Sequence, residues 1–125
     1  MIWLAVAAGG ALGSMARHGV NLMFARSLER AIPYATASVN LIGSAVIGLL
    51  AGLIASGRLH VSIEMRTFVF VGILGGFTTF SSFMLDTLTL AQGADHGLAL
   101  ANVAGQLALG FACVWVGYQL ALALG

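Results

Sequence analysis

The segment from Gly72 to Phe83 has residue types that could bind a small ion inside a membrane. Two adjacent glycines, Gly75 and Gly76, precede four hydroxyl residues that are interleaved with phenylalanines. Glycine weakens a regular helix, and hydroxyl side chains offer the backbone alternative hydrogen bonds. We therefore predict that the helix is broken near Gly75 to Thr79. Backbone carbonyls released by such a break can hold a small hard cation.

Two phenylalanines of this segment can face an anion. Phe80 and Phe83 are three residues apart and share a helix face, with Ser81 and Ser82 beside them. Because an aromatic ring has a positive edge, a small anion can lie against ring edges without a full positive charge that would trap it. A phenylalanine stripe is also common in helix packing. The neighbouring hydroxyls and paired glycines favour an ion path here.

The overall composition indicates that these residues lie in a membrane. The chain has 125 residues, of which 60% are hydrophobic and 7% are charged, and its mean hydropathy is +1.03. Soluble globular domains are far less apolar. The net charge of +1 is too small to form a basic surface for nucleic acid. A disulfide framework is excluded because Cys113 is the single cysteine.

Four apolar stretches can span a bilayer, since a span needs about 20 residues. Pro33 suits the first turn of a helix, and Ser62 followed by Glu64 is typical of a helix start. The first two predicted spans cover residues 2–25 and 33–55, and the polar connector between them covers residues 26–30. After a break over residues 56–66 the third span continues to about residue 91, and the fourth covers residues 98–124. We predict an all-α integral membrane protein that forms one transmembrane domain over residues 1–125.

Glycine pairs predict where helices approach closely. In each pair the glycines are four residues apart and therefore share a helix face. The three pairs are Gly9 with Gly13, Gly48 with Gly52, and Gly72 with Gly76.

The arginines encode no strong orientation in the membrane. Arg26 and Arg30 lie in the loop after the first span, whereas Arg58 and Arg66 lie in the loop after the second. Arginine on one side of the membrane sets topology. An even distribution is compatible with insertion in either direction.

The third span resembles a known family. The motif from Gly75 to Phe83 closely resembles the third-helix signature of the Fluc (CrcB) fluoride channels. Two further segments are similar to that family: 9–13 together with Arg17, and 36–43, which contains Asn40. The resemblance extends over essentially the whole chain in length and span order. It implies an antiparallel, dual-topology homodimer in the bacterial inner membrane, with two fluoride pathways along the dimer interface.

The same resemblance implies roles for individual residues. Backbone carbonyls of Gly75 and Thr78 from both subunits would bind a structural Na⁺ at the dimer centre. Phe80 and Phe83 would line the pathways from opposite subunits, and Arg17 would attract anions at a vestibule. Donors along the path would be Asn40, Thr36, Ser81, Ser82 and, where the family commonly has a hydroxyl or Tyr side chain, Gln106.

Several of these residues have simpler interpretations. Asn40 can hydrogen-bond a neighbouring helix, a contact worth about 1 kcal/mol in membranes, and Arg17 can extend to the interface. Gln106 can also bind an anion so well that passage slows. The sequence departs from the family pattern at Met84 and Asp86, where Ser and Glu are expected, and in the fourth span at Asn102, Gln106 and Gly110.

Three functions are compatible with these features. Electrogenic fluoride export that gives fluoride resistance is what the resemblance implies, and it should be passive because no nucleotide-binding loop is present. No catalytic constellation indicates an enzyme. A small multidrug-type proton-coupled transporter needs a membrane-buried carboxylate, but the first span has no acid and Asp86 is the only acid inside a span. A non-conducting membrane subunit would use every motif for packing.

Overall fold

The computed structural model describes residues 1–27 and 33–124, and every element in these ranges is helical. The all-α prediction is therefore confirmed. Part of the predicted polar connector, together with Arg30 of the arginine count, lies outside the described residues. The elements are α1 (Ile2–Ser27), α2 (Tyr34–Ala55), α3 (Ile63–Arg66), η1 (Thr67–Leu74), α4 (Gly75–Phe77), α5 (Phe80–Gln92) and α6 (His96–Ala123).

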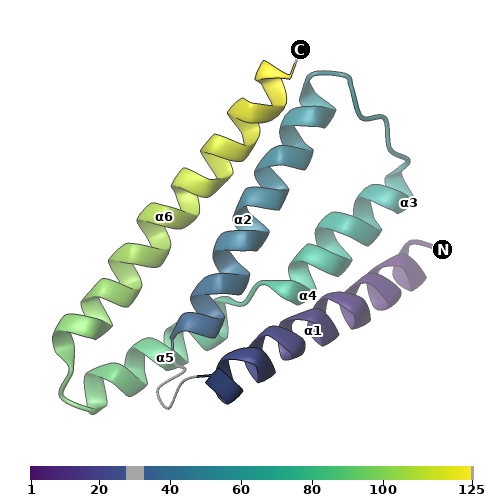
Figure 1. The fold of residues 1–125 in the computed structure, drawn as a ribbon. Helices are drawn as coiled ribbons and strands as arrows, with labels where there is room; N and C mark the ends of the chain where they lie inside the picture. The colour runs from purple at the N-terminus through teal and green to yellow at the C-terminus, as the bar shows by residue number, and fades with distance from the viewer. Residues whose placement is uncertain (28–32, 125) are drawn as a thin grey trace.

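The helices run up and down in sequence order. In Figure 1, both chain termini lie toward the same end of the molecule as the loop between α2 and α3, whereas the turn between α5 and α6 lies at the other end. Helix α2 packs along α6, and α1 packs along η1 and α4. These two pairs diverge from each other, and α5 crosses beneath α2 to reach α6 (Figure 1).

Local side chains begin the helices as the sequence predicts, with one difference. The Ser62 hydroxyl accepts a hydrogen bond of 3.2 Å from the backbone N–H of Met65, which confirms the predicted helix start. Pro33 is the residue just before α2 rather than part of its first turn. Asp95 caps α6 by accepting a bond of 3.2 Å from the N–H of Leu98.

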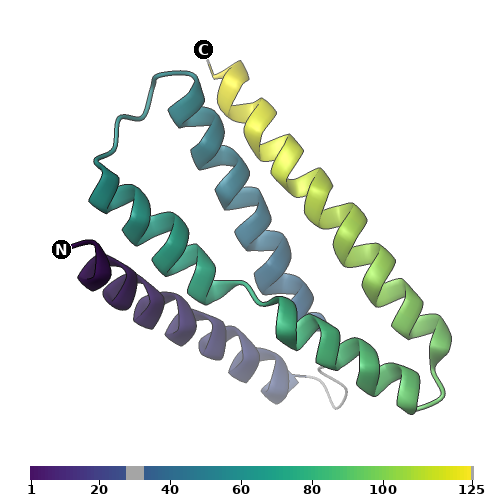
Figure 2. The same ribbon diagram turned by 180° about the vertical axis from the view of Figure 1, so that it is seen from behind.

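The third span is irregular at two places. Residues Thr67–Leu74 form a π-helix, which the sequence does not predict. After three residues of α-helix, Thr78 and Thr79 are extended, with ψ angles of 159° and 117°, and α5 then begins at Phe80. The extended segment is visible between α4 and α5 in Figure 2. The predicted break near Gly75 to Thr79 is confirmed.

Glycines allow backbones to touch along both helix pairs. A Cβ atom on Gly48 would lie 2.9 Å from the Cα of Val114 in α6, and one on Gly72 would lie 2.8 Å from the Cα of Gly9 in α1. A Cβ atom on Gly13 would overlap the carbonyl of Ile73. We call these contacts the glycine seams. They confirm that the predicted pairs mark close helix packing.

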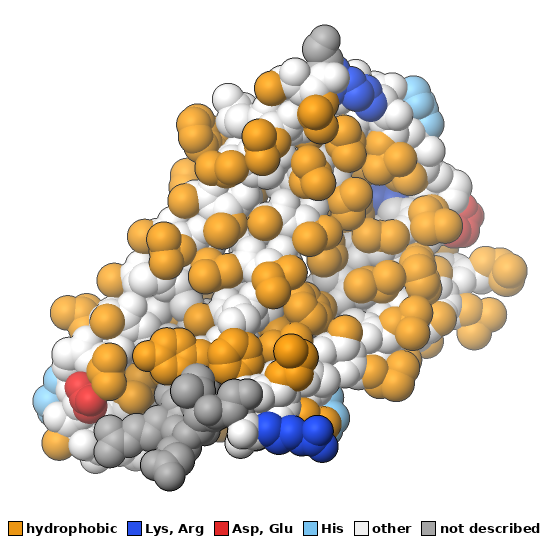
Figure 3. All heavy atoms as spheres, viewed as in Figure 1, with side chains coloured by type: hydrophobic (Ala, Val, Ile, Leu, Met, Phe, Trp, Pro, Cys, Tyr) orange, Lys and Arg blue, Asp and Glu red, His pale blue; other side chains and the backbone are white. Residues whose placement is uncertain are grey.

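The surface is that of a membrane protein. Figure 3 shows hydrophobic side chains over the face between the two ends, with charged side chains toward the ends. Most large apolar side chains are exposed, and Val39 is completely buried. Three segments of the described chain are long and apolar enough to span a bilayer: Tyr34–Ala55, Ile63–Gln92 and His96–Ala123. Helix α1 is long but contains Arg17 and His18, and its span stays a prediction.

Candidate ion path at the helix break

Asn40 satisfies the backbone at the helix break. The N–H of Thr79 donates to Asn40 Oδ1 at 2.8 Å, and Asn40 Nδ2 donates to the Thr79 carbonyl at 3.1 Å. One primary amide therefore bonds both backbone groups of a residue that has left the helix. Irregular backbone at membrane depth requires such partners, because lipid supplies none.

Arg17 lies at the break. Its Nη1 donates to the Thr78 carbonyl at 3.2 Å. The Thr78 hydroxyl donates to the Leu74 carbonyl at 2.9 Å and thereby continues the last turn of α4. The residue that the resemblance assigns to a vestibule is thus hydrogen-bonded to one of the two carbonyls that the resemblance assigns to Na⁺. A guanidinium on a carbonyl makes a charge-assisted bond, which is stronger than a neutral one.

A cleft of about 360 Å³ opens beside the break, between α2 and the third span. Its walls combine polar backbone at the break with apolar side chains. Four of the predicted site residues line it, since Asn40, Gly75, Thr78 and Phe80 all contribute. Its further lining residues are Gly43, Ser44, Ile47, Phe70, Leu74 and Thr79.

Phe80 and Phe83 differ in their surroundings. Phe80 is 70% exposed, whereas Phe83 is 4% exposed. Their ring centroids are 5.8 Å apart with an interplanar angle of 73°, an edge-to-face arrangement. Phe80 therefore projects from the chain, whereas Phe83 packs inside it.

The hydroxyl residues of the motif bond to one another. Thr79 Oγ1 accepts from the N–H of Ser82 at 3.2 Å and donates to the Ser82 hydroxyl at 3.0 Å. The Ser81 hydroxyl lies 3.4 Å from Thr79 Oγ1. Ser81 is exposed, whereas Thr36 is buried on α2, one helical turn before Asn40.

A chain of side-chain hydrogen bonds extends from Asn40 into α6 and returns to α5. Asn40 Nδ2 donates to Gln106 Oε1 at 2.8 Å, and Gln106 Nε2 donates to Asn102 Oδ1 at 2.9 Å. Asn102 Nδ2 then donates to the Thr87 hydroxyl at 2.9 Å, and that hydroxyl donates to the Phe83 carbonyl at 2.8 Å. We call Asn40, Gln106, Asn102 and Thr87 the amide ladder.

Two members of the ladder were not predicted as site residues. Asn102, which is 7% exposed, stands out in the sequence only as a departure from the family pattern, and nothing in the sequence marks Thr87. The available signal was the spacing of Asn102 and Gln106, which are four residues apart in an otherwise apolar helix and share a face.

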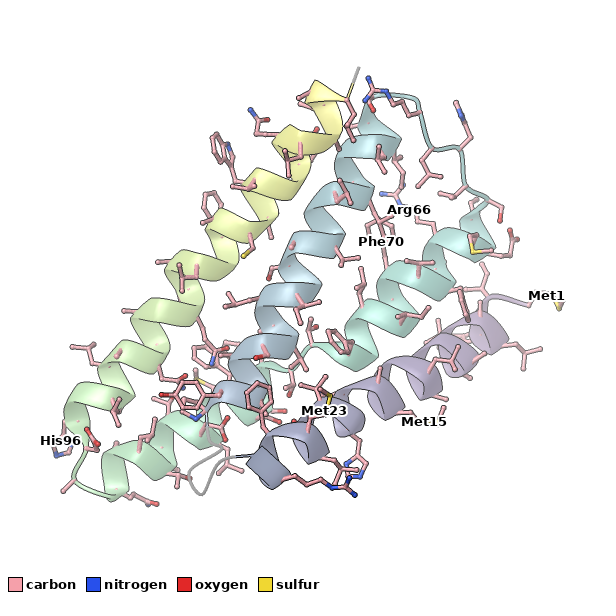
Figure 4. All side chains as sticks on the ribbon, viewed as in Figure 1. Met1, Met15, Met23, Arg66, Phe70 and His96 are labelled. Carbon is pink, nitrogen blue, oxygen red and sulfur yellow. The ribbon has the colours of Figure 1, made fainter. Side chains whose placement is uncertain are left out.

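Two charged groups lie elsewhere along the third span. Asp86 Oδ2 is buried and has no hydrogen-bond partner within the described residues. Arg66 lies over the ring of Phe70 at 5.8 Å from its centroid (Figure 4). The stacking holds the guanidinium at the start of η1, toward one end of the molecule.

Comparison with known proteins identifies the family. Residues 4–118 match the family model described as CrcB-like protein, Camphor Resistance (CrcB). The chain belongs to the CrcB family. The resemblance inferred from the third span is therefore confirmed, and the matched range includes every candidate site residue from Arg17 to Gln106.

Curated CrcB relatives carry a functional name. A protein of Opitutus terrae is 44% identical over 124 residues, which cover 98% of this chain and 94% of that protein. A protein of Thermus thermophilus is 47% identical over 122 residues, which cover 98% of this chain and 96% of that protein. A protein of Paramagnetospirillum magneticum is 47% identical over 114 residues, which cover 90% of this chain and 89% of that protein. All three are named fluoride-specific ion channel FluC. The prediction that the protein is not an enzyme is confirmed.

Proposed function

We propose that the protein is a channel through which fluoride leaves the cell passively and electrogenically, which gives fluoride resistance. The observation that carries the proposal is the break at Thr78–Thr79, where Asn40 bonds both backbone groups of Thr79 beside an exposed phenylalanine ring. The names of the CrcB relatives support fluoride as the ion.

The chemistry of the site suits a strongly hydrated anion. A selective path must replace water around the ion with donors and ring edges, yet must not bind the ion too tightly to release it. Neutral amides, hydroxyls and aromatic edges meet both requirements. The proposed pathway residues are Phe80, Phe83, Asn40, Thr36, Ser81, Ser82 and Gln106, and Arg17 would attract anions toward them.

The proposed assembly is an antiparallel homodimer in the bacterial inner membrane, in which α1 also spans the bilayer, so that each subunit has four spans. A single subunit leaves the cleft open on one side and Phe80 projecting from it. A second copy of the chain would cover both and add its own ring edges. The even distribution of arginines supports insertion in both directions.

Gly75 and Thr78 fit a structural Na⁺ at the centre of such a dimer. Both residues line the cleft, and the Thr78 carbonyl accepts one hydrogen bond, from Arg17. A carbonyl oxygen has two lone pairs, so one remains for a hard cation. The ion would supply a fixed positive charge that joins the two subunits.

Fluoride efflux from liposomes that contain only this protein tests the proposal. With a potential applied to drive the anion, we expect wild-type vesicles to lose fluoride and Phe80→Ile vesicles to retain it, because the variant removes an aromatic edge. Phe111→Ile is the matched control, since Phe111 lies on α6 and is 75% exposed. Wild-type vesicles that hold their fluoride would contradict the channel, and normal flux through Phe80→Ile would remove that ring from the path.

One observation favours a second candidate. A proton-coupled transporter needs a carboxylate inside the membrane, and Asp86 Oδ2 is buried without a partner among the described residues. Membership of the CrcB family weighs against this function. The same vesicles separate the two, because a transporter would exchange protons for a cationic drug and would not release fluoride.

A further inference from the structure

The direction of every hydrogen bond in the amide ladder follows from one backbone group. The N–H of Thr79 can only donate, so the Asn40 atom that faces it must be the oxygen. Asn40 therefore directs its NH₂ group to Gln106, and the Gln106 oxygen must accept the bond. The same reasoning continues through Asn102 to the hydroxyl of Thr87. Thr79 thus fixes the orientation of three amides.

This orientation occupies both donors of Asn40. A primary amide has two N–H bonds, and those of Asn40 bond the Thr79 carbonyl at 3.1 Å and Gln106 Oε1 at 2.8 Å. An anion that reaches Asn40 must therefore displace one of these two oxygens. Displacing the Thr79 carbonyl would leave the backbone of the helix break without its partner. Displacing Gln106 moves only a side chain of another helix, so Gln106 is the group that an anion replaces.

We infer that Gln106 is a specificity-determining residue that competes with the anion for Asn40. The inference rests on the proposed function, because it takes Asn40 as a fluoride donor. The bond from Gln106 Nε2 to Asn102, and from Asn102 to Thr87, holds the competing oxygen in place. Asn102 is therefore a positioning residue that acts through Gln106.

Competition of this kind favours small, strongly accepting anions. A charged acceptor forms a hydrogen bond roughly twice as strong as a neutral amide oxygen does. A compact halide concentrates its charge and displaces Gln106 readily, whereas a larger halide accepts more weakly and loses to the amide. Only an anion that accepts a hydrogen bond more strongly than the Gln106 oxygen does can therefore bind Asn40.

Fluoride flux measured against fluoride concentration tests the role of Gln106. Gln106→Met is similar in size but lacks the oxygen, so we expect the half-saturating fluoride concentration to fall about fivefold, which corresponds to one interhelical hydrogen bond of about 1 kcal/mol. We also expect chloride leakage to rise relative to fluoride flux. Gln106→Glu keeps an oxygen acceptor, and its half-saturating concentration should equal or exceed the wild-type value.

A control separates competition from general packing. Gln119 lies exposed on the same helix, and Gln119→Met should leave the half-saturating concentration unchanged. Asn102→Leu removes the oxygen that accepts the hydrogen bond from Gln106 Nε2 and should shift the concentration in the same direction as Gln106→Met, but less. A half-saturating concentration in Gln106→Met that equals or exceeds the wild-type value would overturn the inference.

A second measurement does not depend on the variants folding. Side-chain ¹⁵N–¹H resonances of Asn40 and Gln106 in the wild-type protein should move as fluoride is added, and chloride at equal concentration should not move them. If wild-type vesicles conduct but these resonances stay fixed at saturating fluoride, the competition fails while the channel stands. If wild-type vesicles do not conduct, the proposed function itself fails.

Discussion

The glycine seams and the amide ladder join helices of this chain by different physical means. In the seams, Gly48 and Gly72 bring backbone against backbone, and what matters is the absence of a side chain. In the ladder, Asn40 and Gln106 join three helices through donors and acceptors whose direction is fixed. A seam therefore tolerates no added volume, whereas the ladder tolerates changes of shape better than changes of hydrogen-bonding type.

The largest effect should come from filling a seam. Gly48→Ala places a methyl group against the backbone of Val114, and a backbone cannot rotate away as a side chain can. We expect a loss of about 3 kcal/mol in the free energy of unfolding, the upper part of the usual range for overpacking. Denaturation in mixed detergent micelles measures it.

Gly105 offers the matched control for this variant. It lies in α6, and a Cβ atom there would meet nothing within 4 Å. Gly105→Ala should be neutral or slightly stabilising, because alanine favours helix by up to about 1 kcal/mol. Equal losses in Gly48→Ala and Gly105→Ala would show that the seam is not the tight contact we describe.

An intermediate effect should follow from removing the amide at the break. Asn40→Leu leaves the N–H and carbonyl of Thr79 without their partner, and a buried unpaired group costs about 1–3 kcal/mol. Because the cleft is open, water can replace part of this loss, and we expect about 2 kcal/mol of destabilisation. Hydrogen–deuterium exchange over residues 78–82 should accelerate.

Two companion variants sharpen this prediction. Asn40→Asp keeps an acceptor for the N–H of Thr79 and should exchange more slowly than Asn40→Leu at that amide. Ser38→Ala, on the same helix, should leave exchange unchanged. Unaltered exchange in Asn40→Leu would mean that the break does not depend on Asn40.

The smallest effect should come from the far end of the ladder. Thr87→Val keeps the shape of the side chain but removes the hydroxyl that accepts from Asn102. An interhelical hydrogen bond in a membrane is worth about 1 kcal/mol, so the free energy of unfolding should fall by no more than about 1 kcal/mol. If Thr87→Val lost as much free energy of unfolding as Gly48→Ala, the glycine seams and the amide ladder would not differ in the way described.

The sequence predicted local features well because their causes are local. Paired glycines and consecutive threonines weaken the helix wherever they stand, and the break lies among them at Thr78–Thr79. The glycine pairs mark close contacts because glycines four residues apart share a helix face and leave room for a neighbouring backbone. Span boundaries followed from apolar runs and from caps such as Ser62.

The partners across helices could not be predicted from the sequence. Asn40 bonds Thr79, which is 39 residues away, and Gln106 is 66 residues from Asn40. Any polar residue of an apolar helix could be the partner, and only the crossing of α2, α5 and α6 selects among them. The sequence does not predict the π-helix, because residues 68–74 are an apolar run like that of an ordinary span.

That π-helix has an evolutionary consequence. A π-helical turn holds more residues than an α-helical turn. If one residue of η1 were deleted, the segment could therefore become ordinary α-helix without displacing its neighbours. α5 is regular α-helix, so a one-residue deletion there would rotate the side chains after it in that helix by about 100°. Length variation among homologues should therefore be tolerated upstream of the break and eliminated downstream of it.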